Sequence, residues 1–137
     1  MPLDPILVRN TREWLVRATD DLGVAEHDLK SATPFVRAAL FHCQQAAEKA
    51  LKGFLTWHDR PFEKTHDLRE VGSLCAELDS SLEPLLKTAA ALTQYAWKFR
   101  YPGGVPEPMP EEAQQSLALA RQVLDAILER LPAEVRP

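Results

Sequence analysis

FHCQQAAEKALKGFL, the stretch from Phe41 to Leu55, decides the fold of this chain together with the Thr65-His66-Asp67-Leu68 sequence that follows it. Apolar side chains recur through this stretch, and just before it, at helical spacing. They are Phe35, Ala39, Cys43, Ala46, Ala47, Ala50, Leu51 and Phe54. At about 100° per residue they cover roughly half of a helix circumference. A helix with so wide an apolar surface packs against more than one neighbour.

Polar residues of the same helix follow spacings of three, four, three and four, and so form one stripe along a border of the apolar surface. The stripe consists of His42, Gln45, Lys49, Lys52 and Thr56. We expect Gln44 and Glu48 on the opposite border. The stripe offers an imidazole, an amide and two ammonium groups to one ligand or one partner surface. The alternative is a solvated helix flank whose lysine stems cover apolar surface.

Composition predicts one domain over residues 1–137. With 45% hydrophobic and 26% charged residues, the chain can form one core and is too short for two comfortable domains. It has no long apolar run, and the N-terminal sequence MPLDPILVRNTREW lacks the features of a signal peptide. We therefore expect a cytoplasmic protein that does not enter a membrane.

Cysteine and histidine usage does not indicate a metal site. Cys43 and Cys75 are far apart and each lies among apolar helix positions, which is typical of buried thiols. The four histidines are scattered, without a close carboxylate or cysteine ligand pattern. We expect neither a metal nor a cofactor.

The net charge of −4 argues against unspecific binding along a nucleic-acid backbone, which requires a basic surface. The charge is unevenly distributed, however. Residues 35–69 contain six Lys or Arg against four Asp or Glu, and three of the four histidines. A phosphate-bearing ligand would be attracted to this middle segment.

Helical periodicity runs through almost the whole chain, and no alternating strand pattern is convincing. The expected helices span residues 5–31, 34–58, 66–79, 83–100 and 110–131. Asp4-Pro5 and Thr33-Pro34 supply start signals, and Thr65 is a candidate cap for the third helix. Residues 102–110, rich in proline, form a stiff connection. The sequence predicts an all-α, up-and-down bundle of about five helices.

Three segments, in their order along the chain, resemble the HEPN domain family of prokaryotic helical proteins. They are the long first helix, the QQAAEKALK core with His66-Asp67-Leu68 downstream, and Phe99-Arg100-Tyr101-Pro102 closing the fourth helix. The resemblance covers nearly the whole chain. It implies a helical bundle that forms a homodimer, is linked to nucleotide or RNA binding, and is often paired with a small nucleotidyltransferase. Many relatives are toxin ribonucleases with such a transferase as antitoxin.

The resemblance also implies a catalytic motif. In the catalytic branches of that family, an arginine and a histidine lie near the start of a late helix, with four to six residues between them. They meet across the dimer to cleave RNA without metal. Imidazole can move a proton near neutral pH, and guanidinium can stabilise the charge of the transition state. Arg100 matches the arginine, but Tyr101-Pro102-Gly103-Gly104 follows it, and no histidine occurs after His66. The usual dyad is absent from its usual place, so we expect a protein that is more a binder than an enzyme.

Two other pairs have the formal spacing, and they make His66, Arg60 and His42 the catalytic candidates. Arg60 and His66 lie in and beside a loop and could converge there. Arg37 and His42 diverge by about 140° on one helix and would cooperate only across an interface.

Several residues have a structural interpretation beside the functional one. His66 with Asp67 can be a helix cap or a site residue. His42 can be a core or dimer histidine or a ligand contact. Arg100 and Tyr101 can anchor an interface or hold a phosphate and a base.

Aromatic side chains near the end of the fourth helix predict the dimer interface, which we assign to Trp97, Phe99 and Tyr101. The predicted nucleotide- or RNA-binding residues are His42, Gln45, Lys49, Lys52, His66 and Arg100. The expected protein is therefore a binding homodimer that partners a nucleotidyltransferase in a toxin–antitoxin-like system. A metal-independent toxin ribonuclease and a purely structural partner protein are the alternatives.

Overall fold

The computed structural model describes residues 2–137, and the described chain is all-α, with five α-helices and three short 3₁₀-helices. The α-helices are α1 (Pro5–Lys30), α2 (Val36–Trp57), α3 (Leu68–Leu78), α4 (Glu83–Ala89) and α5 (Pro110–Glu129). The 3₁₀-helices are η1 (Ser80–Leu82), η2 (Ala90–Ala96) and η3 (Ala133–Val135). The all-α bundle predicted from the sequence is confirmed.

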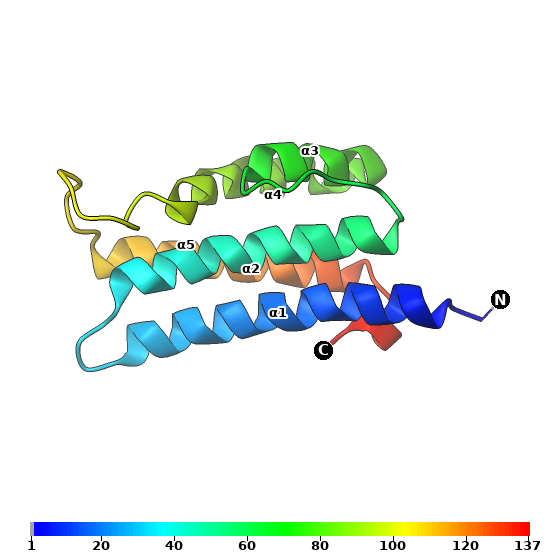
Figure 1. Cartoon of the computed structure of the whole chain (residues 1–137), viewed down its shortest axis with the longest axis horizontal. Coiled ribbons are helices and arrows are strands. Elements are labelled where there is room, and N and C mark those ends of the chain that lie inside the picture. The colour runs from blue at the N-terminus through cyan, green and yellow to red at the C-terminus, as the bar shows by residue number, and fades with distance from the viewer. Residues whose placement is uncertain (1) are drawn as a thin grey trace.

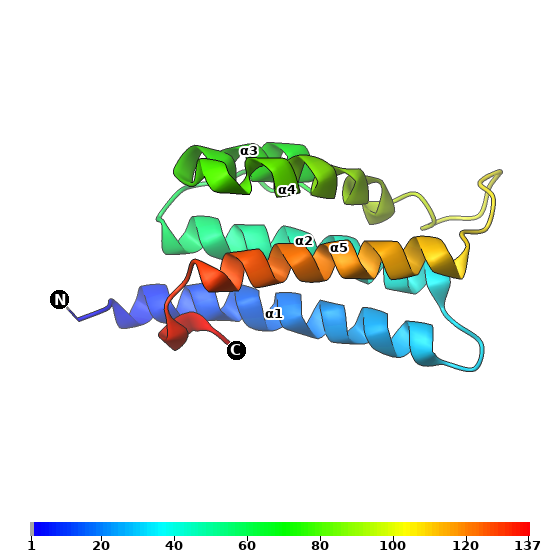
Figure 2. The same cartoon turned by 180° about the vertical axis from the view of Figure 1, so that it is seen from behind.

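The helices form three layers (Figure 1). The hairpin of α3 and α4 lies on one side of α2 and α5, and α1 lies on the other side, as the reverse view in Figure 2 also shows. Helix α2 is the central element. Its side chains Leu40, Cys43, Ala47, Leu51 and Leu55 are fully or almost fully buried. The wide apolar surface predicted for this helix therefore contacts neighbours on several sides, although Phe35, placed there by the sequence pattern, is 60% exposed.

Helix boundaries follow local signals. Asp4 caps α1 by accepting a hydrogen bond from the Ile6 amide at 2.9 Å, with Pro5 in the first turn. Helix α2 begins at Val36, two residues later than expected. The cap of α3 is Asp67, which accepts from the Arg69 amide at 3.0 Å, whereas the Thr65 hydroxyl accepts from the Asp67 amide just outside the helix.

The helix expected over residues 83–100 is wrong in its second half. Only residues 83–89 are α-helical, η2 continues to Ala96, and no regular helix follows before residue 110. The buried side chains Leu86, Ala89, Leu92 and Tyr95 recur every third residue. A 3₁₀-helix has three residues per turn and keeps such positions on one face, whereas the predicted pattern assumed α-helical spacing.

The chain end returns to the first helix. The Arg12 guanidinium donates to the backbone oxygen of Arg136, and Val135 of η3 is fully buried. The connection over residues 101–109 projects at the end of the bundle where α2 and α5 begin (Figure 1). No helix within residues 2–137 has the length and apolar content needed to cross a membrane.

Two helical glycines differ in their surroundings, and substitution should separate them. A Cβ at Gly53 would lie 3.0 Å from Leu15 Cδ2 and 3.2 Å from Trp14 Cβ, whereas a Cβ at Gly23 would meet nothing within 4 Å. Gly23→Ala should raise the free energy of unfolding by up to about 1 kcal/mol through helix propensity. Gly53→Ala should lower it, because overpacking of about 1–3 kcal/mol outweighs that gain. Urea unfolding measures both, and equal effects would contradict the close contact of α1 with α2.

Candidate functional site

A buried carboxylate organises the polar side of α2. Glu48, with a side chain only 5% exposed, receives the Gln44 amide at 3.1 Å and contacts His66 Nδ1 at 2.7 Å, both through Oε1. Its other oxygen accepts from Lys52 Nζ at 3.0 Å, and the Lys52 side chain is 8% exposed. Buried charges require such partners, because each ion loses its hydration.

The same side chains hold the loop between α2 and α3. Gln44 Nε2 donates to the backbone oxygen of His66 at 3.1 Å, and Lys52 Nζ donates to that of Thr65 at 3.1 Å. The Lys52 ammonium also lies 5.8 Å from the Trp14 ring centre and 5.7 Å from that of Phe62. The QQAAEKALK sequence of α2 and the downstream His66 are therefore joined by one network of hydrogen bonds.

A second carboxylate connects α1 to α2. Asp21, only 8% exposed, contacts His42 Nδ1 at 2.8 Å through Oδ1 and accepts from Lys49 Nζ at 2.6 Å through Oδ2. In both contacts a carboxylate orients an imidazole through Nδ1, which leaves Nε2 as the nitrogen for a ligand. The His42 side chain is 29% exposed and that of His66 is 57% exposed.

A pocket of about 320 Å³ lies where the first turns of α2 meet η2 and the residues after it. Its lining combines two guanidinium groups, one imidazole and three aromatic rings. The lining residues are Arg37, Ala38, Phe41, His42, Tyr95, Phe99 and Arg100. Guanidinium groups suit phosphate and aromatic rings suit a base, so this combination is typical of nucleotide sites.

The aromatic wall of the pocket is held from behind. Tyr95 donates its hydroxyl to Glu112 Oε2 of α5 at 2.5 Å, and the rings of Tyr95 and Phe99 stack with centres 6.1 Å apart. Burial, assisted by the hydrogen bond to Glu112 and its charge, raises the pKa of Tyr95 to about 12. The phenol therefore stays protonated at neutral pH and keeps donating to α5.

The predicted binding residues lie partly in the pocket and partly at the two buried carboxylates. His42 and Arg100 share the pocket. Lys52 and His66 meet at Glu48, and Lys49 joins His42 at Asp21. Half-buried Gln45 donates to Gln44 Oε1 at 2.7 Å.

One expectation about side-chain placement was wrong. Gln44 and Glu48 were placed on the border opposite the stripe, yet Lys52 of the stripe bonds to Glu48, because residues four apart lie on one helix face. Arg37 and His42, which were expected to cooperate only across an interface, line the same pocket of one chain. The Arg37 guanidinium binds Glu107 at 3.5 Å and His42 contacts Asp21, so their cooperation across an interface stays a prediction. The pocket spans the polar side of α2, so a divergence of about 140° still lets both border it.

Arg60 does not join His66. Its guanidinium binds Glu77 of α3 at 2.7 Å, whereas His66 contacts Glu48. Arg60 and His66 could have converged in the loop, but each binds its own carboxylate partner instead. Sequence reasoning missed Asp21, which carries no local signal because it lies 21 residues before His42.

The predicted interface residues differ in exposure. Trp97 is 56% exposed and Tyr101 77% exposed, whereas Phe99 packs against the core. Both cysteines are buried and unpaired, and burial raises the pKa of each thiol to about 12. Within residues 2–137 no three His, Cys, Asp or Glu side chains are grouped to hold a metal ion.

The chain is similar to known proteins in sequence and in fold. The sequence model of the HEPN domain matches residues 11–131. The chain belongs to the HEPN family. The crystal structure of TT1696 from Thermus thermophilus resembles this HEPN domain with a TM-score of 0.73 and 30% identity, over 88% of this chain and 98% of that one. No curated protein sequence matches the chain. Family membership links the chain to modules related to nucleotides or RNA.

Removing the buried carboxylate should destabilise this HEPN domain strongly. Glu48→Ala leaves the Lys52 ammonium buried without its anion, so the free energy of unfolding should fall by about 3–5 kcal/mol. The matched variant Glu83→Ala breaks an exposed ion pair with Lys87 and should leave it nearly unchanged. Guanidinium unfolding measures both, and a small effect of Glu48→Ala would show that the loop does not depend on this contact.

Proposed function

We propose that this HEPN domain binds a nucleotide or a short single-stranded RNA segment in the pocket between α2 and η2. The observation that carries the proposal is the presence of Arg37 and Arg100 beside Phe41, Tyr95 and Phe99 in one pocket. Arg100 and Arg37 suit a phosphate group, although the Arg37 guanidinium also binds Glu107 at 3.5 Å. Half-buried Phe41 and Phe99 provide a stacking surface that tolerates different bases, and buried Tyr95 supports it by stacking on Phe99.

The predicted binding residues differ in how directly they are connected to the pocket. His42 lies in the pocket and is oriented by Asp21, which also holds Lys49. Lys52 and His66 act by fixing the loop to α2 through Glu48. We therefore assign direct contact to His42 and Arg100, a neighbouring role to Gln45 and Lys49, and a positioning role to Lys52 and His66.

The expected homodimer stays a proposal, and exposed apolar side chains support it. Trp97 and Tyr101 flank pocket residues Phe99 and Arg100 in the chain, and Val105 and Met109, 44% and 64% exposed, follow in the same connection. Exposed aromatic residues of this kind are enriched in interfaces. A dimer through this connection would border the pocket. The small nucleotidyltransferase partner and the toxin–antitoxin-like role are further proposals that rest on family membership.

Metal-independent RNA cleavage is the second candidate, and one observation favours it. His42 and two arginines line one pocket of the same chain, and a carboxylate orients the imidazole. His42 would take the proton of a 2′-hydroxyl as its oxygen attacks the adjacent phosphorus, and the 5′-oxygen would leave with a proton from water, giving a cyclic phosphate. Incubation of purified protein with labelled RNA in EDTA tests this activity, and cleavage that His42→Ala abolishes would favour the enzyme over the binder.

Arg100→Ala should weaken nucleotide binding. Loss of a charged phosphate contact of about 1.5–3 kcal/mol corresponds to a rise in the dissociation constant of roughly ten- to a hundredfold. Phe41→Ala should have a similar effect through lost stacking of about 1–3 kcal/mol. Isothermal titration with ATP, AMP and a five-nucleotide single-stranded RNA measures the change.

Arg9→Ala is the matched control, because Arg9 lies exposed on α1, outside the lining of the pocket. It should leave the affinity unchanged, whereas a loss equal to that of Arg100→Ala would indicate unspecific charge attraction. Wild-type protein that binds none of the three ligands would overturn the proposal in favour of a purely structural partner.

The dimer has its own test. Sedimentation velocity at micromolar concentration should show a dimer for the wild type, and Tyr101→Ala should shift it toward monomer by removing an exposed aromatic anchor. The exposed Ile6 on α1, at the other end of the bundle, provides the control Ile6→Ala. A wild-type monomer would contradict the proposed interface.

A further inference from the structure

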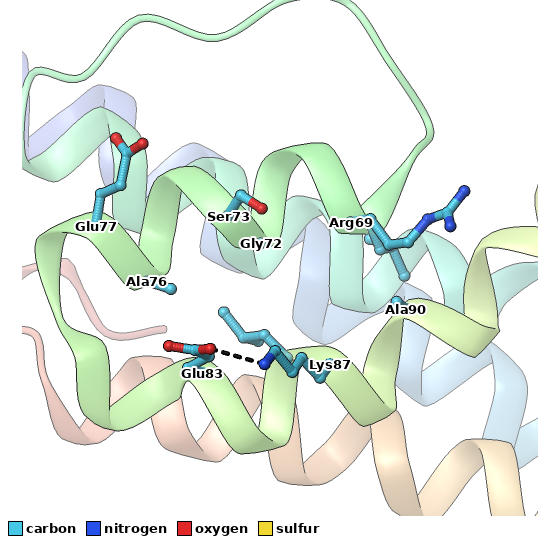
Figure 3. A pocket seen from close by; sticks show the side chains of 10 residues that line it. Arg69, Gly72, Ser73, Ala76, Glu77, Glu83, Lys87 and Ala90 are labelled. Atoms are coloured by element: carbon cyan, nitrogen blue, oxygen red, sulfur yellow. Dashed lines mark ion pairs between the residues drawn. The ribbon is translucent and has the colours of Figure 1, made fainter.

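A second pocket lies outside the nucleotide site, in the cleft between α3 and α4 (Figure 3). Its volume is about 560 Å³. Buried Leu68, Gly72 and Leu86 belong to its lining, together with half-buried Ala76 and Ala90. Charged or polar side chains complete it, namely Arg69, Ser73, Glu77, Glu83 and Lys87. It shares no lining residue with the pocket between α2 and η2.

Sequence spacing explains why the cleft is open. Positions 69, 72, 73, 76 and 77 form one face of α3, and positions 83, 86 and 87 form one face of α4, which residue 90 at the start of η2 extends. Along these faces the α3 side chains between the charged residues are glycine, serine and alanine. A Cβ at Gly72 would already lie 3.4 Å from Leu86 Cβ, so the helices approach closely at the floor while short side chains leave the space above it unfilled.

Charges are placed unequally along the cleft. Arg69 lies at the end where α3 begins, and Glu77 and Glu83 lie at the other end, with the Lys87 ammonium turned toward Glu83 (Figure 3). Glu83 binds Lys87 at 2.8 Å, and Glu77 binds Arg60 of the preceding loop at 2.7 Å. These pairs are exposed, and exposed ion pairs contribute little to stability, so a ligand can replace either partner at low cost.

From this geometry we infer that the cleft is a docking groove for an amphipathic helix of a partner protein. The lined face of α3 covers eight residue steps, or about 12 Å, which equals roughly two helical turns of a ligand. Apolar side chains at positions i, i+3, i+4 and i+7 of the partner would enter between α3 and α4. An acidic first turn would meet Arg69, and basic residues in the last turn would meet Glu77 and Glu83. That charge order also suits the partner helix's own dipole.

Two labelled peptides test the groove. The first is a 12-residue helical peptide with Glu in its first turn, Leu at positions i, i+3, i+4 and i+7, and Lys in its last turn. The second exchanges Glu and Lys and is otherwise identical. Fluorescence anisotropy with the full chain should show at least about fivefold tighter binding of the first peptide, which corresponds to about 1 kcal/mol.

Charge reversal in the protein should reverse the preference. Protein with Arg69→Glu, Glu77→Lys and Glu83→Lys should bind the second peptide more tightly than the first. Equal binding of both peptides to wild type and to this variant would overturn the charge-matched groove. All three side chains are largely exposed, so the variant should fold, and thermal unfolding monitored by circular dichroism checks this.

Filling the cleft gives an independent test. Ser73→Trp puts a large side chain on the exposed rim, whereas Thr88→Trp puts the same side chain at an exposed position of α4 outside the lining. Only Ser73→Trp should abolish peptide binding, and it should leave ATP and RNA binding unchanged, which separates this groove from the nucleotide pocket. Equal effects of the two variants would contradict the groove. Loss of wild-type self-association in Ser73→Trp would assign the surface to a second copy and overturn the proposed partner helix.

Discussion

The buried ion pair between Glu48 and Lys52 is the contact on which the rest of the structure depends. Both side chains are less than a tenth exposed, so each charge requires a partner. Each side chain also contacts the loop before α3: Lys52 donates to the backbone oxygen of Thr65, and Glu48 contacts the His66 imidazole. The loop in turn fixes the start of α3, where the Leu68 amide donates to the Thr93 hydroxyl of η2 at 3.0 Å. A buried contact in α2 is therefore linked to the helix that supplies Tyr95 to the pocket.

This linkage explains why residues with ligand-binding chemistry occur in a motif that is largely structural. Lys52 and His66 are bonded within the fold, and Asp21 holds His42 and Lys49 against α1. The carboxylates Asp21 and Glu48 nevertheless orient His42 and His66 through Nδ1. Each imidazole can therefore be held by the fold and still offer its Nε2 to a ligand. A pocket with two arginines and three aromatic rings then lies at the end of the stripe rather than along it.

Two surfaces with different chemistry result from one helical bundle. The pocket between α2 and η2 is rich in aromatic and guanidinium groups. The cleft between α3 and α4 is lined by leucine and small side chains, with Arg69 at one end and Glu77 and the ion pair of Glu83 with Lys87 toward the other. They share no residue and so can be occupied together. With the two proposed roles, the module would hold a nucleotide at one surface and a partner protein at the other.

The sequence by itself determined the helical class and most helix boundaries, because apolar periodicity, capping Asp4 and Asp67, and the prolines are local signals. It also pointed to His42 and Arg100, which share the pocket. Two predictions from the sequence failed. An α-helix was expected where η2 lies, but buried side chains recur there every third residue and not at α-helical spacing. The pairing of Lys52 with Glu48 was also not foreseen. Only the tertiary structure decided that Asp21 orients His42 and that Arg60 binds Glu77 rather than joining His66. A helical pattern gives the direction of a side chain on its own helix, whereas its partner depends on which distant segment packs there.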